Sequence, residues 1–271
     1  MGADFEWGPL VSGGPLFIGI LNLTPDSFSD GGRFTDPEAA LAQARSLVAS
    51  GCGMLDLGAE STRPGAAPLS PGEEWQRLEA PLRRLRAALP GVPLSLDTRH
   101  AEVADRGLAE GVAVLNDVTG FRDPAMLGLA VASGCGLIAM RSRLQDGGFQ
   151  MPPYDGEGET TADRALAELA EVRDRLRHAG LAPERILLDP GFGFGTTFAE
   201  DLALWEALPD LERRLGWPLD RICLGISRKR FTAWRAGDPT LAPPLRDLAT
   251  GALHREARDF GLKIFRTHQT S

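Results

Sequence analysis

Short apolar segments alternate with longer amphipathic segments along most of the chain. The apolar segments are rich in branched residues and are bounded by glycine or proline, which is typical of buried strands. The segments between them repeat their apolar residues every three to four positions, as helices packed on one face do. This pattern predicts eight strands, at residues 16–22, 54–58, 93–97, 113–116, 136–140, 185–189, 221–225 and 262–266.

Helix-start signals support the amphipathic segments. Asp36 and Ser70 each offer an N-cap residue followed by proline, and Glu73 completes a possible capping box with Ser70. We predict helices that begin at these two sites and further helices at about 101–110, 124–132, 161–179, 198–215 and 245–260. Residues 141–160 are the most irregular stretch and are predicted to form a long flexible loop.

Regular alternation of strand and helix predicts βαβ units and a parallel sheet. Eight strands in 271 residues favour an α/β fold of the (β/α)8 TIM-barrel type, with residues 1–271 forming a single domain. An open Rossmann-like sheet is the alternative. It is disfavoured because the glycines of segment 191–195 lack the GxGxxG spacing of a dinucleotide-binding loop.

The two ends of the chain carry separate expectations. Residues 1–15 contain too many Gly and Pro for a helix, and are expected to form an extension or hairpin that closes the bottom of the barrel. The sequence ends at Ser271, soon after the eighth strand, so the usual C-terminal eighth helix is expected to be missing. Either a longer gene product or a neighbouring subunit would then cover that strand, and we expect a homodimer.

Composition narrows the function classes. The chain is 43% hydrophobic and 24% charged, as soluble globular proteins are. A net charge of −8 argues against a nucleic-acid partner. The N-terminus does not resemble a signal peptide and no apolar run reaches membrane-spanning length, so we expect a cytoplasmic protein with no membrane partner. Cys52, Cys135 and Cys223 lie far apart and are interpreted as buried thiols.

Polar residues stand at the carboxyl ends of most predicted strands, where the active site of a TIM barrel lies. One subset offers carboxylates, an amide and an ammonium group, which suit the donor and acceptor edge of a flat heterocycle: Asp97, Asn116, Asp189 and Lys229. A second subset suits a phosphate-like anion: Asn22, Arg63, Arg266 and His268. Taken singly, an aspartate at a strand end could equally cap the next helix.

Six segments, in order along the chain, resemble the signature motifs of dihydropteroate synthases. They are ILNLTPDSFSDGG (20–32), DLGAESTRPGA (56–66), SLDT (95–98), LNDVTGF (115–121), LLDPGFGFG (187–195) and GISRK (225–229). The resemblance implies a TIM-barrel transferase of folate biosynthesis. It would condense 6-hydroxymethyl-7,8-dihydropterin pyrophosphate with p-aminobenzoate in an SN1-like displacement, releasing pyrophosphate and 7,8-dihydropteroate.

The resemblance also implies roles for individual residues. The pterin would be bound by Asp97, Asn116, Asp189, Lys229, Met140 and Phe194. The pyrophosphate would be bound by Asn22, Arg63, Arg266 and His268, with Asn22 also contacting Mg²⁺. The p-aminobenzoate would be bound by Thr62, Pro64 and Phe28. Direct catalytic roles would fall to Asp97, Lys229, Asp30 and Arg63.

Four residues depart from the usual motifs of that family: Arg141, Thr196, Arg230 and Gln269. Arg141, Arg230 and Gln269 motivate one alternative, a paralogue that binds a pterin without making dihydropteroate. A third reading is a pterin-dependent methyltransferase, which would share the barrel and the pterin pocket. It ranks last because it would not need the segment 61–64 for an arylamine.

Overall fold

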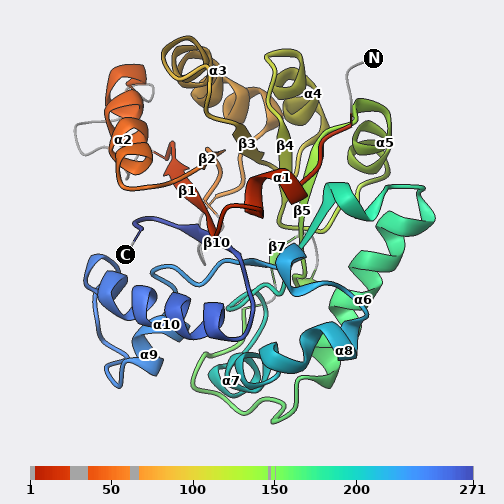
Figure 1. Cartoon of the computed structure of the whole chain (residues 1–271), viewed down its shortest axis with the longest axis vertical. Helices are drawn as coiled ribbons and strands as arrows, with labels where there is room; N and C mark the ends of the chain where they lie inside the picture. The colour runs from red at the N-terminus through yellow and green to blue at the C-terminus, as the bar shows by residue number, and fades with distance from the viewer. Residues whose placement is uncertain (1–3, 25–35, 62–66, 146–147, 150, 271) are drawn as a thin grey trace.

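The computed structural model describes residues 4–24, 36–61, 67–145, 148–149 and 151–270 (Figure 1). Eight parallel strands form one sheet in the order β8-β5-β4-β3-β2-β1-β10-β9, and a parallel bridge between Leu188 and Ile222 links its two ends. The predicted TIM-barrel fold is therefore confirmed, with the barrel nearly closed. The strands are β1 Leu16–Asn22, β2 Met54–Gly58, β3 Leu94–Asp97, β4 Val114–Asp117, β5 Gly136–Met140, β8 Ile186–Asp189, β9 Cys223–Leu224 and β10 Ile264–Thr267.

Helices surround the strands, as Figure 1 shows. The predicted starts at Asp36 and Ser70 are confirmed: the Asp36 side chain accepts from Glu38 N, and Ser70 forms a capping box with Glu73. Such caps satisfy backbone N–H groups that have no partner within the helix. The outer helices are α2 Pro37–Ala49, α3 Pro71–Ala88, α4 Ala101–Ala109, α5 Pro124–Ser133, α6 Asp163–His178, α7 Phe198–Glu206, α8 Leu211–Leu215, α9 Arg230–Arg235 and α10 Asp247–Asp259.

The prediction that residues 1–15 contain no helix is wrong. Gly8–Val11 forms the short helix α1, near the centre of Figure 1, with Pro9 in its first turn where a missing N–H costs nothing. Trp7 is fully buried, and its Nε1 donates to Arg185 O at 3.0 Å. This segment packs on inward-facing strand residues and so closes one end of the barrel: Leu16, Ile18, Met54, Val114, Ile138, Leu187, Cys223 and Ile264.

Other differences from the predicted elements are local. The helix expected over 198–215 is interrupted by a 3-10 turn at Leu208–Asp210, because Pro209 cannot donate a helical hydrogen bond. The helix expected over 245–260 begins only at Asp247. Helix α9 was not predicted, since six residues are too few to show a helical period. The stretch 141–160 is not wholly irregular, because β6 Leu144–Gln145 pairs antiparallel with β7 Gly148–Phe149.

Inward-facing side chains fill the barrel. Alternate residues of each strand face inward. Ile18 is aligned with Met54 in the apolar layer next to α1. One step further along the strands, Ile20 is aligned with Asp56 and Asp56 with Ser95. Four polar residues of the barrel interior are joined by hydrogen bonds beyond the apolar residues next to α1, and we call them the polar layer: Asp56, Asp97, Asn116 and Arg266.

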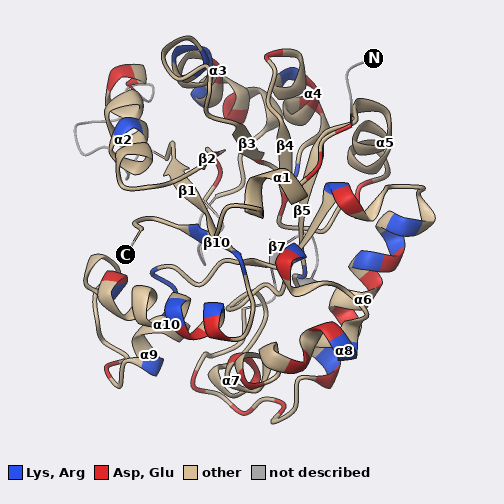
Figure 2. Ribbon diagram, in the orientation of Figure 1, with Lys and Arg blue, Asp and Glu red and all other residues tan. Residues whose placement is uncertain are grey.

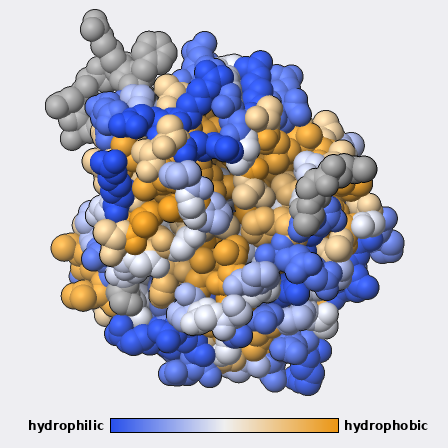
Figure 3. All heavy atoms as spheres, turned by 45° about the horizontal axis from the view of Figure 1, so that its top comes forward, coloured by the Kyte–Doolittle hydropathy of each residue, from blue (hydrophilic) through white to orange (hydrophobic). Residues whose placement is uncertain are grey.

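The outer surface is mixed in character. Figure 2 shows acidic and basic residues interspersed on the outer helices, and exposed ion pairs such as Arg83–Glu110 join neighbouring ones. On the face drawn in Figure 3, apolar residues gather toward the middle and hydrophilic residues surround them. No helix in the described part of the chain has the length and apolar character needed to cross a membrane.

His254 is a buried polar residue on the outside of the barrel. It lies on α10 with 1% of its surface exposed, and within the described structure neither ring nitrogen has a hydrogen-bond partner. Its ring packs against Phe265 and Phe17, at centroid distances of 4.8 and 6.1 Å. Burial lowers the pKa of His254 from 6.5 to about 4, so the folded protein keeps this ring neutral at pH values where the unfolded chain protonates it.

We expect this group to make the fold acid-sensitive. Between pH 6.5 and 4 the unfolded chain binds a proton that the folded chain excludes, so the free energy of unfolding falls as the pH falls. Its contribution between pH 7 and pH 5 is about 2 kcal/mol. His254→Leu should remove that part of the slope in urea denaturation, whereas His178→Leu, which changes an exposed histidine, should retain it. Equal slopes in wild type and His254→Leu would contradict the assignment.

Candidate active site

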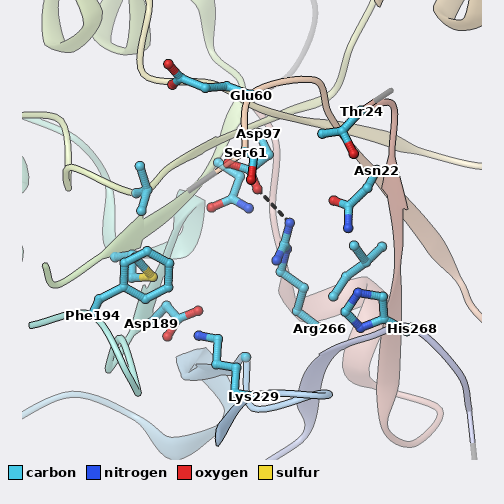
Figure 4. A pocket seen from close by; sticks show the side chains of 15 residues that line it. Asn22, Thr24, Glu60, Ser61, Asp97, Asp189, Phe194, Lys229, Arg266 and His268 are labelled. Carbon is cyan, nitrogen blue, oxygen red and sulfur yellow. Dashed lines mark hydrogen bonds and ion pairs between the residues drawn. The ribbon is translucent and has the colours of Figure 1, made fainter. Parts of the chain in front are cut away.

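A pocket lies at the carboxyl ends of the strands (Figure 4). Parallel strands of a barrel end at one rim, so residues distant in the sequence meet there. Nine residues predicted to form the site line this pocket: Asn22, Asp97, Asn116, Met140, Asp189, Phe194, Lys229, Arg266 and His268. Its lining also includes Ile20, Thr24, Glu60, Ser61, Val118 and Gly225. The other predicted site residues lie outside the described residues: Phe28, Asp30, Thr62, Arg63 and Pro64.

Arg266 joins the two predicted subsets. Its Nε donates to Asp56 Oδ2 at 2.6 Å, and its second guanidinium arm donates to Asp97 Oδ2 at 2.6 Å (Figure 4). Burial acts to lower the pKa of Arg266, but the charges of Asp56 and Asp97 outweigh it and raise that pKa. The guanidinium therefore stays charged at the border between the heterocycle subset and the anion subset.

Asp97 combines burial with this ion pair. Burial raises the pKa of the Asp97 carboxyl to about 7, with a further upward contribution from Asp56, although Arg266 opposes the shift. A carboxyl that titrates near neutral pH can lose its proton when a ligand offers it an N–H donor.

Lys229 and Asp189 form the opposite side of the pocket and point toward one another in Figure 4. Lys229 Nζ donates to Phe192 O at 3.0 Å and lies 4.7 Å from the centroid of the Phe194 ring, within cation–π range. Burial lowers the pKa of Lys229 and raises that of Asp189, and each charge opposes the shift of the other. A Cβ at Gly225 would lie 2.9 Å from Asp189 Oδ2, so a larger residue there would displace this carboxylate.

The backbone before Lys229 is held in an uncommon conformation. Arg228 has a φ of 59°, which costs a non-glycine residue about 1 kcal/mol. Its guanidinium binds both Asp247 oxygens at 2.7 Å, and Arg246 donates to its carbonyl at 2.7 Å. These contacts hold the turn that directs Lys229 into the pocket.

Asn22 and His268 line the side of the pocket next to Arg266 (Figure 4). His268 Nδ1 lies 3.1 Å from Ser227 Oγ, which also accepts from His268 N. Among the described residues, no group of three or more His, Cys, Asp or Glu side chains could hold a metal ion. Mg²⁺ commonly takes one or two protein oxygens and completes its shell with phosphates and water. The Asn22 amide oxygen thus fits a Mg²⁺ that arrives with a phosphate ligand.

Three of the residues that depart from the usual family motifs, Arg141, Thr196 and Arg230, contact neighbouring side chains or backbone. Thr196 Oγ1 donates to Asp201 at 2.7 Å, and the Arg230 guanidinium lies 4.3 Å from the Tyr154 ring centroid. Arg141 is only 1% exposed and donates to Pro190 O and Gly191 O at 2.8 Å and to Glu168 at 2.9 Å.

Arg143 holds the other end of the same loop. It donates to Gly195 O at 2.7 Å, and pairs with Glu168 and Glu200. The two arginines therefore clamp both ends of segment 190–195, which presents Phe194 to the pocket and the Phe192 carbonyl to Lys229.

Sequence reasoning missed Asp56 and the role of Arg141. Asp56 begins one of the family-like motifs and belongs to neither predicted subset, yet it contacts both Arg266 and Asn116. The available signal was an acid within the apolar strand MLDLG, since an aspartate is rarely buried without a partner. Arg141 follows a buried strand and gave no signal of burial by itself.

Comparison with known proteins gives a consistent result. A family model described as pterin binding enzyme matches residues 18–268. A dihydropteroate synthase of Synechocystis is 38% identical over 97% of this chain and 87% of its own length. The Xanthomonas albilineans dihydropteroate synthase with 4-aminobenzoic acid has a TM-score of 0.80 and 35% identity, covering 94% of this chain and 87% of that one. The same enzyme in complex with 7,8-dihydropteroate gives a TM-score of 0.78 and 32% identity, with the same coverage.

The Arg141 contacts predict a large effect on stability. Arg141→Met should lower the free energy of unfolding by about 2 to 4 kcal/mol, because two carbonyls and a share of the Glu168 charge lose their buried partner. Arg164 pairs with the same Glu168 but is half exposed, so Arg164→Met should cost less than about 1 kcal/mol. Urea denaturation of both variants measures the difference. Equal losses would contradict the clamp.

Proposed function

This chain belongs to the pterin-binding enzyme family, among the dihydropteroate synthases, and from that premise we propose that it is itself such a synthase. It condenses 6-hydroxymethyl-7,8-dihydropterin pyrophosphate with p-aminobenzoate and releases 7,8-dihydropteroate and pyrophosphate. The observation that carries the proposal is the pocket. It combines a heterocycle-binding set of Asp97, Asn116, Asp189 and Lys229 with the partly buried cation Arg266 beside Asn22 and His268.

The pterin end is assigned to the inner wall of the pocket. Asp97 and Asp189 accept hydrogen bonds from ring N–H groups, and Lys229 donates to ring acceptors. Asn116 donates from Nδ2 to Asp56 at 2.9 Å, which leaves its amide oxygen to accept a hydrogen bond from the ring. Met140 and Phe194 supply apolar contacts to the ring faces. Each polar group of the inner wall thereby acquires a hydrogen-bond partner. A ligand whose donors and acceptors were arranged differently would leave some of these groups unpaired.

The pyrophosphate end is assigned to Arg266, His268 and Asn22, with Arg63 a further prediction. Arg266 and His268 donate to the phosphate oxygens, and Asn22 would hold Mg²⁺, which supplies charge neutralisation for the leaving pyrophosphate when bound. Donors already in place where negative charge develops lower the barrier, because they need no reorganisation during the reaction.

The reaction needs no covalent enzyme intermediate. The bond from the pterin methylene carbon to the phosphate oxygen breaks, and its electron pair leaves with pyrophosphate. The cation left on the methylene is stabilised by the ring electrons and by Asp97 and Asp189 below it. The p-aminobenzoate nitrogen then forms the new C–N bond and loses a proton. Phe28, Asp30, Thr62, Arg63 and Pro64, from the first two loops, are predicted to bind the arylamine and assist departure.

Several narrower expectations remain predictions. They are the single domain over 1–271, the homodimer and the cytoplasmic location.

The synthase activity is tested by pyrophosphate release from the pterin pyrophosphate, with Mg²⁺, in the presence and absence of p-aminobenzoate. We expect release that depends on p-aminobenzoate and falls at least about 100-fold in both Asp97→Asn and Arg266→Ala, since each removes a buried charged contact. Arg235→Ala, which changes a residue of α9 paired at the surface with Glu256, is the control and should be unaffected. Pterin binding without turnover would instead support the inactive paralogue.

The raised pKa of Asp97 predicts a pH dependence. If the ionised carboxylate accepts the pterin N–H, kcat/KM should rise as the pH increases through about 7 and then level off. Asp97→Asn should lose this limb along with most of the activity, because its amide does not titrate. A limb at the same pH that persists in Asp97→Asn would belong to another group and would overturn the assignment.

A further inference from the structure

Asp56 is a fully buried carboxylate at the centre of the polar layer. It faces the barrel interior from the middle of β2, aligned with Ile20 on one side and Ser95 on the other. One oxygen, Oδ2, accepts from Arg266 Nε at 2.6 Å and from Asn116 Nδ2 at 2.9 Å. A single carboxylate oxygen thus holds two residues of the proposed site, one on β10 and one on β4.

The contact with Asn116 determines which end of its amide faces the ligand. An ionised carboxylate can only accept, so it selects the Nδ2 end. The amide oxygen is then available to the pocket as an acceptor. Without Asp56 the Asn116 amide could rotate, and either its oxygen or its nitrogen could face the ligand.

The contact between Asp56 and Arg266 matters because Asp97 has two competing partners, Arg266 and the ligand. In the ligand-free pocket Asp97 is paired with Arg266 at 2.6 Å. A heterocycle that takes hydrogen bonds from Asp97 must compete with that pair. Asp56 binds the guanidinium through Nε, a different nitrogen from the one that binds Asp97, so Arg266 keeps a buried carboxylate partner when Asp97 turns to the ligand.

We propose that Asp56 is a positioning residue for the proposed reaction. It holds Arg266 and Asn116 in place while Asp97 exchanges its contact with Arg266 for one with the pterin. This inference rests on the proposed function. It adds a residue that acts through Arg266 and Asn116 rather than by touching the reacting atoms.

The test compares Asp56→Asn with Ser95→Ala. The first change keeps the size of the side chain and removes its charge. Ser95 is the matched control, because it lies in register with Asp56, is also fully buried, and its Oγ has no hydrogen-bond partner in the described structure. Binding of 6-hydroxymethylpterin, which carries no phosphate, is measured by calorimetry from pH 5.5 to 8.5, beside kcat/KM.

At pH 8, Asp56→Asn should bind the pterin at least about tenfold more weakly, because Arg266 is then neutralised by Asp97 alone and competes harder for it. The pH midpoint of binding should also move downward, since the Asp56 charge no longer opposes ionisation of Asp97. Ser95→Ala should stay within about twofold of wild type at all pH values. Wild-type affinity at pH 8 in Asp56→Asn would overturn the proposal, even if the midpoint moved.

A second measurement needs no pterin. The Arg266 Nε–H resonance, assigned by its loss in Arg266→Lys, should exchange slowly with solvent in wild type and Ser95→Ala and rapidly in Asp56→Asn. Unchanged protection in Asp56→Asn would overturn the inference. If wild type binds no pterin, the proposed function fails while this result still decides the role of Asp56. If Asp56→Asn does not fold, the same exchange is measured in wild type saturated with pterin. The Arg266 Nε–H should then remain protected from exchange, and loss of that protection would overturn the proposal.

Discussion

A partly buried cation shared by two carboxylates is the constraint on which the site depends. Arg266 crosses the barrel interior between Asp56 and Asp97, with 2.6 Å contacts to both. A guanidinium in that position is tolerable only if its charge is compensated, and a carboxylate there only if it is paired. The polar layer therefore behaves as one unit: removing Arg266 leaves two carboxylates without their shared cation, and removing either carboxylate leaves the guanidinium with one partner. The apolar residues next to this unit are covered by Trp7 and α1 at the other end of the barrel.

Arginine side chains also hold the loops around the pocket. Arg141 and Arg143 bind carbonyls at both ends of segment 190–195, and Arg228 is fixed by Asp247 beside Lys229. In each case a guanidinium spans two segments and satisfies backbone or carboxylate acceptors at several points, which a single ammonium cannot do. Phe194 and Lys229 therefore face the pocket from supported positions. Arg141 departs from the usual family motif, yet its contacts serve the wall of the same pocket.

Most of the barrel could be predicted because its signals are local. Apolar runs bounded by Gly or Pro located β1, β2 and β5 to the residue, and the barrel topology then implied that Asp97, Asn116 and Asp189 meet. The missed features are not local. Asp56 and Arg266 are 210 residues apart in sequence, and no pattern along the chain pairs them. Arg141 resembles any loop arginine until the carbonyls around it are known, and six-residue α9 is shorter than two helical turns. Phe28 could be assigned only by resemblance.

The electrostatics of the pocket favour a heterocycle on its inner wall over a simple anion. Burial raises the pKa values of Asp97 and Asp189 and lowers that of Lys229, so all three groups are biased toward their neutral forms in the ligand-free pocket. A ligand edge with N–H donors opposite the carboxylates stabilises their ionised forms, so ligand binding and proton release are linked. An anion at the same place would meet two carboxyls, and its binding would push their pKa values further upward. Arg266 lies between the part of the pocket that favours a heterocycle and the part that favours an anion. In the proposed reaction, the bond between the heterocycle and its phosphate group would be broken at this position.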